Sequence, residues 1–197
     1  MFGLGVDEAR RLHIVRRCEI PLPPGGIVFV TGPSGGGKST ILSLIAELCR
    51  RQDLAMIDFD ALPPLPDVPL VDALEHLDLA GVTSLLGLVG LGDAFVMLRT
   101  PTQLSDGQRY RLRLAQTLDL ARRHTTTNQP AIILADEFGA TLDRLTATNI
   151  AAAIRRTLRG TEHTFVCATT HDDLLEPLDP DVLVVKNLGE HLEIHTR

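Results

Sequence analysis

Short runs of apolar residues, separated by polar or glycine-rich stretches, dominate the pattern of this chain. Runs without period-two alternation predict strands buried on both faces, and they lie at residues 27–30, 54–59, 131–135, 164–169 and 182–185. Helices are predicted between them over residues 39–48, 105–123 and 143–158. This alternation predicts an α/β fold with a doubly wound, mostly parallel sheet. Residues 12–20 are expected to be extended and to add a small N-terminal β portion.

Proline and glycine break up the middle of the chain. Residues 63–69 hold four prolines in seven positions, which excludes a helix interior or a central strand and predicts a boundary or lid loop. Residues 70–99 are apolar but interrupted by glycines, and they predict short helices in a small lobe. We therefore expect a single domain over residues 1–197, with a core at residues 1–60 and 125–197 and a helical subdomain at residues 61–124.

Composition narrows the class of protein. A chain of 197 residues with 44% apolar side chains is long enough to bury one sizeable core. The formal net charge of −6 argues against non-specific attraction to nucleic acid. Cys18, Cys49 and Cys167 are scattered without metal-binding spacing, which predicts free thiols and a cytoplasmic location. No apolar run approaches the length that spans a bilayer, so any membrane segment is expected in another chain.

A candidate phosphate-binding loop follows the apolar run 27–30. Its glycines let backbone N–H groups point at phosphates, and the N-terminus of the following helix favours negative charge. Lys38 can supply positive charge to the β- and γ-phosphates, and the Ser39 hydroxyl is placed to bind Mg²⁺. The alternative is a glycine-rich loop without a ligand. The residues expected to bind the nucleoside triphosphate are Gly32, Pro33, Ser34, Gly35, Gly36, Gly37, Lys38, Ser39 and Thr40.

Two acidic residues end the apolar run at residues 131–135. Because ligands of open α/β sheets lie outside the carboxyl ends of strands, Asp136 is expected beside the phosphate loop, where it can hold Mg²⁺ through water. Glu137 can polarise the attacking water, and such general-base help typically contributes about 10² to 10⁴ in rate. The pair therefore predicts hydrolysis as well as binding.

Four segments, together with the loop at residues 32–40, resemble the motifs of the ATP-binding cassette (ABC) ATPases in order and spacing over about residues 25–172. They are Leu104-Ser105-Asp106-Gly107-Gln108 for the signature, residues 131–137 for the Walker B strand, Ala140-Thr141-Leu142-Asp143 for the D-loop, and Thr169-Thr170-His171 for the switch histidine. The resemblance implies that Lys38, Glu137 and His171 are catalytic, with His171 contacting the γ-phosphate and linking it to Glu137.

The same resemblance implies a homodimer. In the family, the helix end at Ser105 and Gly107 faces the γ-phosphate bound by a second subunit, so two ATP molecules lie between head-to-tail chains. Asp143 of the D-loop joins the nucleotide-binding set by the same resemblance. Taken alone, Leu-Ser-Asp-Gly would be an ordinary helix N-cap with Ser105 as the cap, and His171 an ordinary histidine at a strand end.

The chain departs from the family pattern after the strand predicted at residues 54–59. No glutamine stands in residues 59–69, where the family senses Mg²⁺ and the γ-phosphate, and Asp60 is the candidate substitute. With the proline-rich loop, Phe138 in place of a common proline makes the chain resemble soluble, stand-alone cassette ATPases more than transporter subunits. No aromatic residue for stacking on adenine stands in residues 6–13, which leaves base specificity open.

We therefore expect an ATP-hydrolysing cassette ATPase whose ATP-sandwiched dimer acts on an unknown protein partner or on nucleic acid. The alternatives are the ATP-binding subunit of a membrane transporter, a weakly hydrolysing regulatory module gated by nucleotide and, with least support, a P-loop kinase. The candidate nucleic-acid contacts are Arg109, Arg111 and Arg113, followed by Arg122 and Arg123, and a solvated basic surface is the alternative interpretation of them.

Overall fold

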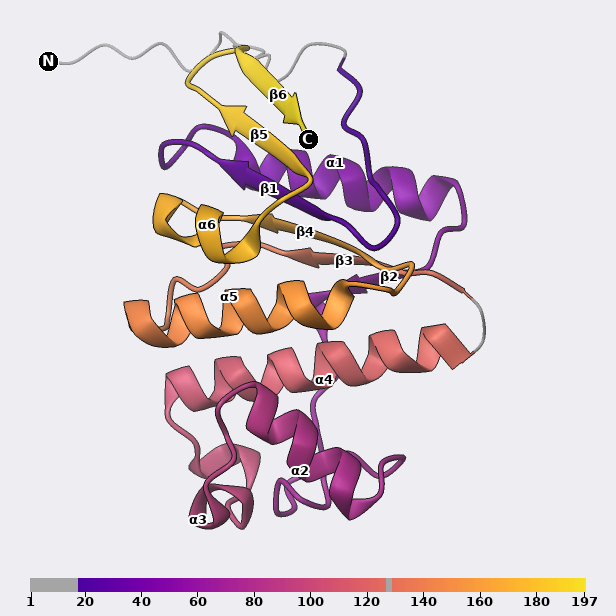
Figure 1. The fold of residues 1–197 in the computed structure, drawn as a ribbon, viewed down its shortest axis with the longest axis vertical. Helices are drawn as coiled ribbons and strands as arrows, with labels where there is room; N and C mark the ends of the chain where they lie inside the picture. Colours follow the sequence, from indigo (N-terminus) through magenta and orange to yellow (C-terminus); the bar gives the residue numbers. More distant parts are fainter. Residues whose placement is uncertain (1–17, 127–128) are drawn as a thin grey trace, which may run out of the picture.

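The computed structural model describes residues 18–126 and 129–197, and within them six strands form one sheet (Figure 1). The strand order is β2-β3-β4-β1-β5-β6, and every neighbouring pair is parallel except β5 and β6. The predicted α/β fold with a mostly parallel sheet is confirmed. The strands are β1 (Ile27–Thr31), β2 (Met56–Asp58), β3 (Ile132–Ala135), β4 (Thr164–Ala168), β5 (Val182–Lys186) and β6 (Leu192–Thr196).

The helices agree closely with the expected segments. Those predicted at residues 39–48, 105–123 and 143–158 correspond to α1, α4 and α5, and the short helices expected within residues 70–99 correspond to α2 and α3. The helices are α1 (Lys38–Arg51), α2 (Leu79–Leu88), α3 (Ala94–Met97), α4 (Asp106–Thr126), α5 (Arg144–Leu158) and α6 (Leu175–Leu178). Short 3₁₀ turns lie at Phe59–Ala61, Pro101–Gln103 and Asp172–Leu174.

Side chains of β1 alternate between two buried layers. Val28 and Val30 pack in the cluster that contains the apolar side of α1, whereas Ile27 and Phe29 pack in the cluster that contains α4 and α5. All four side chains are fully buried, and each such burial stabilises the fold by roughly 1.5–3 kcal/mol. The sheet is therefore covered on both faces, which is why its strands read as continuous apolar runs.

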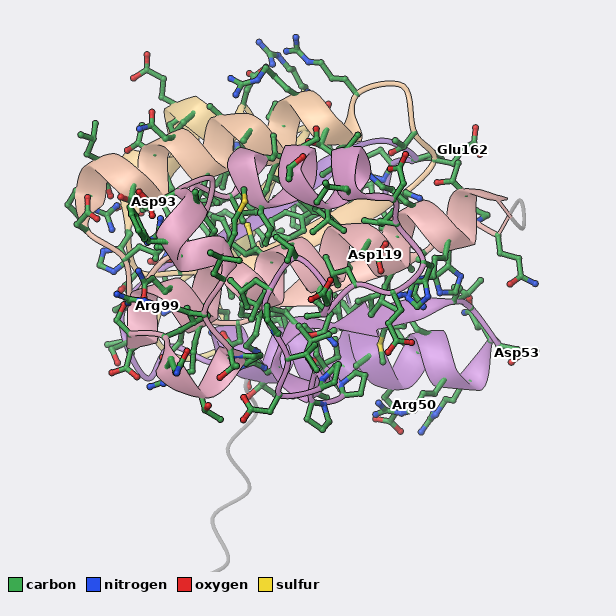
Figure 2. All side chains as sticks on the ribbon, turned by 90° about the horizontal axis from the view of Figure 1, so that it is seen from below. Arg50, Asp53, Asp93, Arg99, Asp119 and Glu162 are labelled. Atoms are coloured by element: carbon green, nitrogen blue, oxygen red, sulfur yellow. The ribbon has the colours of Figure 1, made fainter. Side chains whose placement is uncertain are left out.

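The small helical region shares its buried cluster with the sheet. In Figure 1, α4 runs between α5 and the pair α2 and α3, and buried leucines of α2 and α4 belong to the same cluster as Ile133 of β3. The buried carboxylate of Asp119, near the middle of Figure 2, pairs with Arg123 and lies 3.7 Å from Nε2 of His76. No helix of the described residues is long and apolar enough to cross a bilayer.

Two parts of the sheet differ from expectation. β6, which pairs antiparallel with β5, was not predicted. Its side chains are half-buried or exposed, so it lacks the continuous apolar run that marks the other strands. Residues 18–20 form no strand, while the rest of the expected N-terminal β portion, residues 12–17, lies outside the described residues. Residues 6–13, where we find no aromatic residue that could stack on adenine, also lie outside the described residues.

A buried histidine joins the end of α4 to the start of β3. His163 Nδ1 accepts a hydrogen bond from the N–H of Ala131 at 3.0 Å, and Nε2 lies 2.6 Å from Thr125 Oγ1. Because Nδ1 accepts, the neutral ring carries its proton on Nε2, and a second proton would break the bond to Ala131. Burial, and after it the nearby His124, lowers the pKa of His163.

This lowered pKa predicts a pH-dependent stability. The contribution of His163 to the free energy of unfolding is fully present above the ordinary histidine pKa of about 6.5. It is lost as pH falls below that value, because the unfolded chain then binds the proton more readily than the folded chain does. Urea unfolding at about pH 7.5 and about pH 5.5 measures the loss. The His163→Gln variant is expected to lose less stability over this range than the parent, whereas His195→Gln, on exposed β6, serves as the control. Equal losses in all three proteins contradict the assignment.

Candidate functional site

The loop between β1 and α1 is shaped by three glycines with left-handed backbone angles. The φ angles are 138° at Gly32, 73° at Gly35 and 99° at Gly37, a region that side-chain-bearing residues rarely adopt. At Gly32 there is also no space, because a Cβ would lie 2.0 Å from the carbonyl oxygen of Lys186. The loop therefore leaves β1 in close contact with the end of β5, and only glycine permits that path.

Lys38 begins α1 and points its amino group back into the loop. Nζ donates hydrogen bonds to the carbonyl oxygens of Gly32 at 2.8 Å and Pro33 at 2.9 Å. The residue is only 9% exposed, so its positive charge is held at the base of the loop instead of in solvent. This geometry places a cation and the N-terminus of a 14-residue helix at the same point, and both favour a bound anion.

The loop opens onto a cavity of about 460 Å³, within the range typical of small-molecule sites. It is bounded on one side by the phosphate loop and the start of α1, and on the other by the residues that follow β3 and β4. The lining residues are Ser34, Gly35, Gly37, Lys38, Ser39, Thr40, Asp136, Glu137, Ala140, Thr169 and Thr170. The fold thus gathers most of the predicted loop residues and both acidic residues around one cavity.

Asp136 and Glu137 form a strained turn directly after β3. Asp136 Oδ1 accepts a hydrogen bond from the Glu137 N–H at 2.9 Å. Glu137 has a φ of 46°, a left-handed conformation that costs a non-glycine residue of order 1–3 kcal/mol. Its side chain is exposed and lines the cavity beside the phosphate loop.

Asp60 lies on the other side of Asp136. Its Oδ2 accepts a hydrogen bond from the Asp136 N–H at 3.3 Å, and with Asp58, Asp136 and Ser39 it lines a second cavity of about 280 Å³. Burial raises the pKa of Asp60, the neighbouring carboxylates raise it further, and the Asp136 N–H and Arg113 oppose the rise. The candidate substitute for the missing glutamine therefore contacts the residue expected to bind the metal.

The donor set at this point fits a magnesium ion. The Ser39 hydroxyl and the Asp136 carboxylate line both cavities, and both are hard oxygen donors of the kind that Mg²⁺ prefers. Within residues 18–126 and 129–197 no cluster of three His, Cys, Asp or Glu side chains could hold a metal by itself. That is compatible with Mg²⁺, which usually keeps several waters and takes only one or two protein ligands beside the substrate phosphates.

The predicted signature residues and Asp143 of the predicted D-loop lie outside the lining of the 460 Å³ cavity, whereas Ala140 of the D-loop lines it. Ser105 and Gln108 form a capping box at the start of α4: Ser105 Oγ accepts from the Gln108 N–H at 3.3 Å, and Gln108 Oε1 accepts from the Ser105 N–H at 3.0 Å. Gly107 follows in the first turn of α4. Asp143 caps α5 by accepting from the Thr146 N–H at 2.9 Å, and the Thr146 side chain, followed by this N–H, lowers the pKa of Asp143.

The segment after β4 is held against β1. The His171 N–H donates to Thr169 Oγ1 at 3.2 Å, and the Thr31 hydroxyl donates to Asp172 at 2.5 Å. His171 is half-buried and follows Thr169 and Thr170, which do line the cavity. Both threonines belong to the Thr169-Thr170-His171 motif, but the sequence predicts no role for them. Their position directly before the expected histidine is the sequence signal for their place in the cavity.

Three of the five arginines expected to contact nucleic acid, Arg109, Arg111 and Arg113, donate hydrogen bonds within the chain. Arg111 donates to the Gly90 carbonyl at 2.6 Å, and Arg113 donates to the Phe59 carbonyl at 2.6 Å. Arg109 donates to the Leu104 carbonyl at 2.6 Å and pairs with Asp106. Nucleic-acid binding by these residues stays a prediction, and the structure gives each of them a different contact.

A central parallel strand that ends in a glycine-rich loop, a lysine and a helix N-terminus defines a P-loop nucleotide-binding protein. No protein-family model matches the sequence. The chain is 32% identical over 207 residues to the lipoprotein-releasing system ATP-binding protein LolD of Maricaulis maris, an alignment that covers 88% of this chain and 86% of LolD. It is 31% identical over 210 residues to an uncharacterized ABC transporter ATP-binding protein of Thermotoga maritima, with 89% and 84% covered.

Solved structures share the fold. The dimeric ABC transporter cassette MJ0796 superposes with a TM-score of 0.65 at 20% identity, covering 91% of this chain and 90% of that one. The same cassette in a dimeric post-hydrolysis state with ADP and Pi gives 0.64 at 20% identity, with 98% and 94% covered. With the sequence relatives above, the conclusion is plain: this chain belongs to the family of ABC ATPases.

Replacement of Lys38 tests the phosphate loop. The Lys38→Ala variant removes charge-assisted hydrogen bonds worth about 1.5–3 kcal/mol, so ATP binding is expected to weaken by roughly 10- to 150-fold. Isothermal titration measures the affinity. Arg51→Ala, on the same helix but paired with exposed Glu47, is the control and should bind ATP like the parent. Parental affinity in Lys38→Ala would show that the loop does not bind the nucleotide.

Proposed function

We propose that this chain is an ATP hydrolase that works as a homodimer with two nucleotides held between its subunits. The observation that carries the proposal is the position of Glu137, which directly follows Asp136 and lines the same cavity as Lys38 and Ser39. A carboxylate one residue beyond a metal-binding aspartate supplies what a binding site alone lacks, a base for water. The family relatives support the same reading.

The residues of the cavity divide the chemistry among them. The loop N–H groups and Lys38 bind the phosphates, and Ser39 and Asp136 are the residues that would hold Mg²⁺, whose charge would offset that of the phosphates. Glu137 orients and deprotonates the attacking water. The proposed role of His171 is to contact the γ-phosphate, and its place directly after Thr170 supports that role. Asp60 is proposed to act beside Asp136 in place of a glutamine.

The dimer follows from the residues that lie outside the cavity. Ser105 and Gly107 stand at the N-terminus of the 21-residue helix α4, where the helix dipole favours an anion. We propose that this end binds the γ-phosphate held by a second copy, with Asp143 at the same interface. ATP then contacts both subunits, whereas ADP lacks the γ-phosphate that the second subunit binds. Hydrolysis therefore shifts the population toward separated chains. The dimeric states of MJ0796 support this arrangement.

The partner is a membrane transport protein or a soluble one. The printed names of relatives, which include a lipoprotein-releasing system, favour a second candidate function as the ATP-binding subunit of a transporter. The proline-rich loop, Asp60 and Phe138 favour the stand-alone role that we derive from the sequence.

We place the chain in the cytoplasm, a proposal supported by Cys18, Cys49 and Cys167, which are free thiols. Fractionation of cells that express a tagged chain separates the two candidates. A transporter subunit is expected with the membranes and is released when they are washed with carbonate, whereas a stand-alone ATPase is expected in the soluble fraction before any wash.

Glu137→Gln tests hydrolysis. The amide cannot take a proton from water, so steady-state ATP turnover is expected to fall by at least about 10²-fold while the affinity for ATP stays within about twofold of the parent. Phosphate release and equilibrium binding of ATP measure the two quantities. Glu162→Gln makes the same chemical change at an exposed residue, at the margin of the molecule in Figure 2, and should leave both unchanged. Undiminished turnover in Glu137→Gln would remove the base from the proposal.

A further inference from the structure

The hydroxyl of Tyr110 reaches from α4 to the turn that contains Glu137. Its oxygen accepts a hydrogen bond from the Gly139 N–H at 2.8 Å. Tyr110 lies in the second turn of α4, which begins just after Ser105. The Tyr110 side chain therefore joins two elements. One is α4, whose N-terminus is proposed to face the partner's nucleotide, and the other is the turn that carries Glu137, the proposed base of the same chain.

This turn needs external support. Glu137 has a φ of 46° and Gly139 a φ of 76°, so two of three consecutive residues are left-handed and one of them is not glycine. One hydrogen bond ties the turn to the sheet, because the Ala168 carbonyl of β4 accepts from the Phe138 N–H at 2.8 Å, while Asp136 Oδ1 accepts from the Glu137 N–H within the turn at 2.9 Å. The bond from the Gly139 N–H to Tyr110 ties the same turn to α4.

The ring of Tyr110 also contacts the other side of the site. It packs against the ring of Phe59 with centroids 4.9 Å apart, and the guanidinium of Arg113 lies 4.9 Å from the centroid of the Phe59 ring. Phe59 directly precedes Asp60, which accepts the hydrogen bond from the Asp136 N–H. One half-buried tyrosine thus touches both segments that flank Asp136 and Glu137, the residues proposed to hold the metal and to activate water.

We propose that Tyr110 is a positioning residue for Glu137, through which the placement of α4 sets the base in the same chain. When the N-terminus of α4 engages the partner's nucleotide, the Tyr110 hydroxyl holds the Gly139 N–H and with it the strained conformation at Glu137. This inference rests on the proposed function, because it concerns the hydrolysis step. It assigns Tyr110 no contact with the nucleotide or with water.

The Tyr110→Phe variant tests the bond while it keeps the ring on Phe59. We expect kcat to fall about tenfold while KM and the affinity for ATP stay within about twofold, since nucleotide binding does not depend on the turn. Thr117→Val is the matched control: it removes a buried hydroxyl from the same helix, one that donates to the Arg113 carbonyl at 2.9 Å, and it should keep the parental kcat.

A second variant removes the same bond from the other side. Replacement of the Gly139 backbone amide by an ester, introduced as glycolic acid, deletes the N–H donor and leaves Tyr110 in place. The same tenfold fall in kcat with unchanged KM is expected, even if Tyr110→Phe proves unstable in thermal melts. Parental kcat in either folded variant, or an equal fall in Thr117→Val, overturns the inference. A parent protein that does not hydrolyse ATP would instead overturn the proposed function.

Discussion

The position of β1 in the sheet is the constraint on which the rest of the structure depends. β4 and β5 pair with it in parallel from both sides, and Asp181 holds its first residue by accepting from the Ile27 N–H at 2.8 Å. Burial raises the pKa of Asp181, but its bonds to Arg155 and Ile27 outweigh burial and lower it, so the carboxylate stays charged. The chain leaves β1 at Gly32, pressed against the Lys186 carbonyl. Backbone packing therefore sets the place of the phosphates before any side chain contributes.

Side chains of α4 hold the segment after β2 in place by hydrogen bonds to its backbone. Prolines cannot donate to a sheet, so the segment after β2 has few backbone hydrogen bonds available to it. α4 supplies partners from its side chains: Arg113 donates to the Phe59 carbonyl at 2.6 Å, and Gln116 donates to the Pro63 carbonyl at 2.8 Å. Arg113 is thereby turned toward the segment after β2, whereas Arg109, Arg122 and Arg123 of α4 are exposed. The helical region and the nucleotide-facing edge of the sheet consequently share contacts as well as a buried core.

The sequence was sufficient wherever chemistry and local pattern coincide. Continuous apolar runs predicted the buried parallel strands, and the glycines of residues 32–37 predicted a loop that the positive φ angles now explain. β6 was not predicted because it is an edge strand whose side chains are half-buried or exposed, so it has no continuous apolar run. The left-handed conformation at Glu137 and the contact of Tyr110 with Gly139 depend on residues far apart in the chain, and no local pattern specifies them. Arg109, Arg111 and Arg113 have the sequence pattern of a solvated basic surface, and only the structure shows that each donates to a carbonyl of another segment or of the preceding turn.

In the proposed active state, two copies close around two nucleotides, and each copy completes the cavity of the other. The direct measurement is the molar mass of Glu137→Gln by light scattering in saturating ATP with Mg²⁺, in ADP with Mg²⁺, and with Ser105→Arg added to block the end of α4. The proposed dimer predicts the mass of two chains in ATP, and the mass of one chain in ADP and in the Ser105→Arg variant. The mass of one chain in ATP, or a dimer indifferent to nucleotide and to Ser105→Arg, would contradict it.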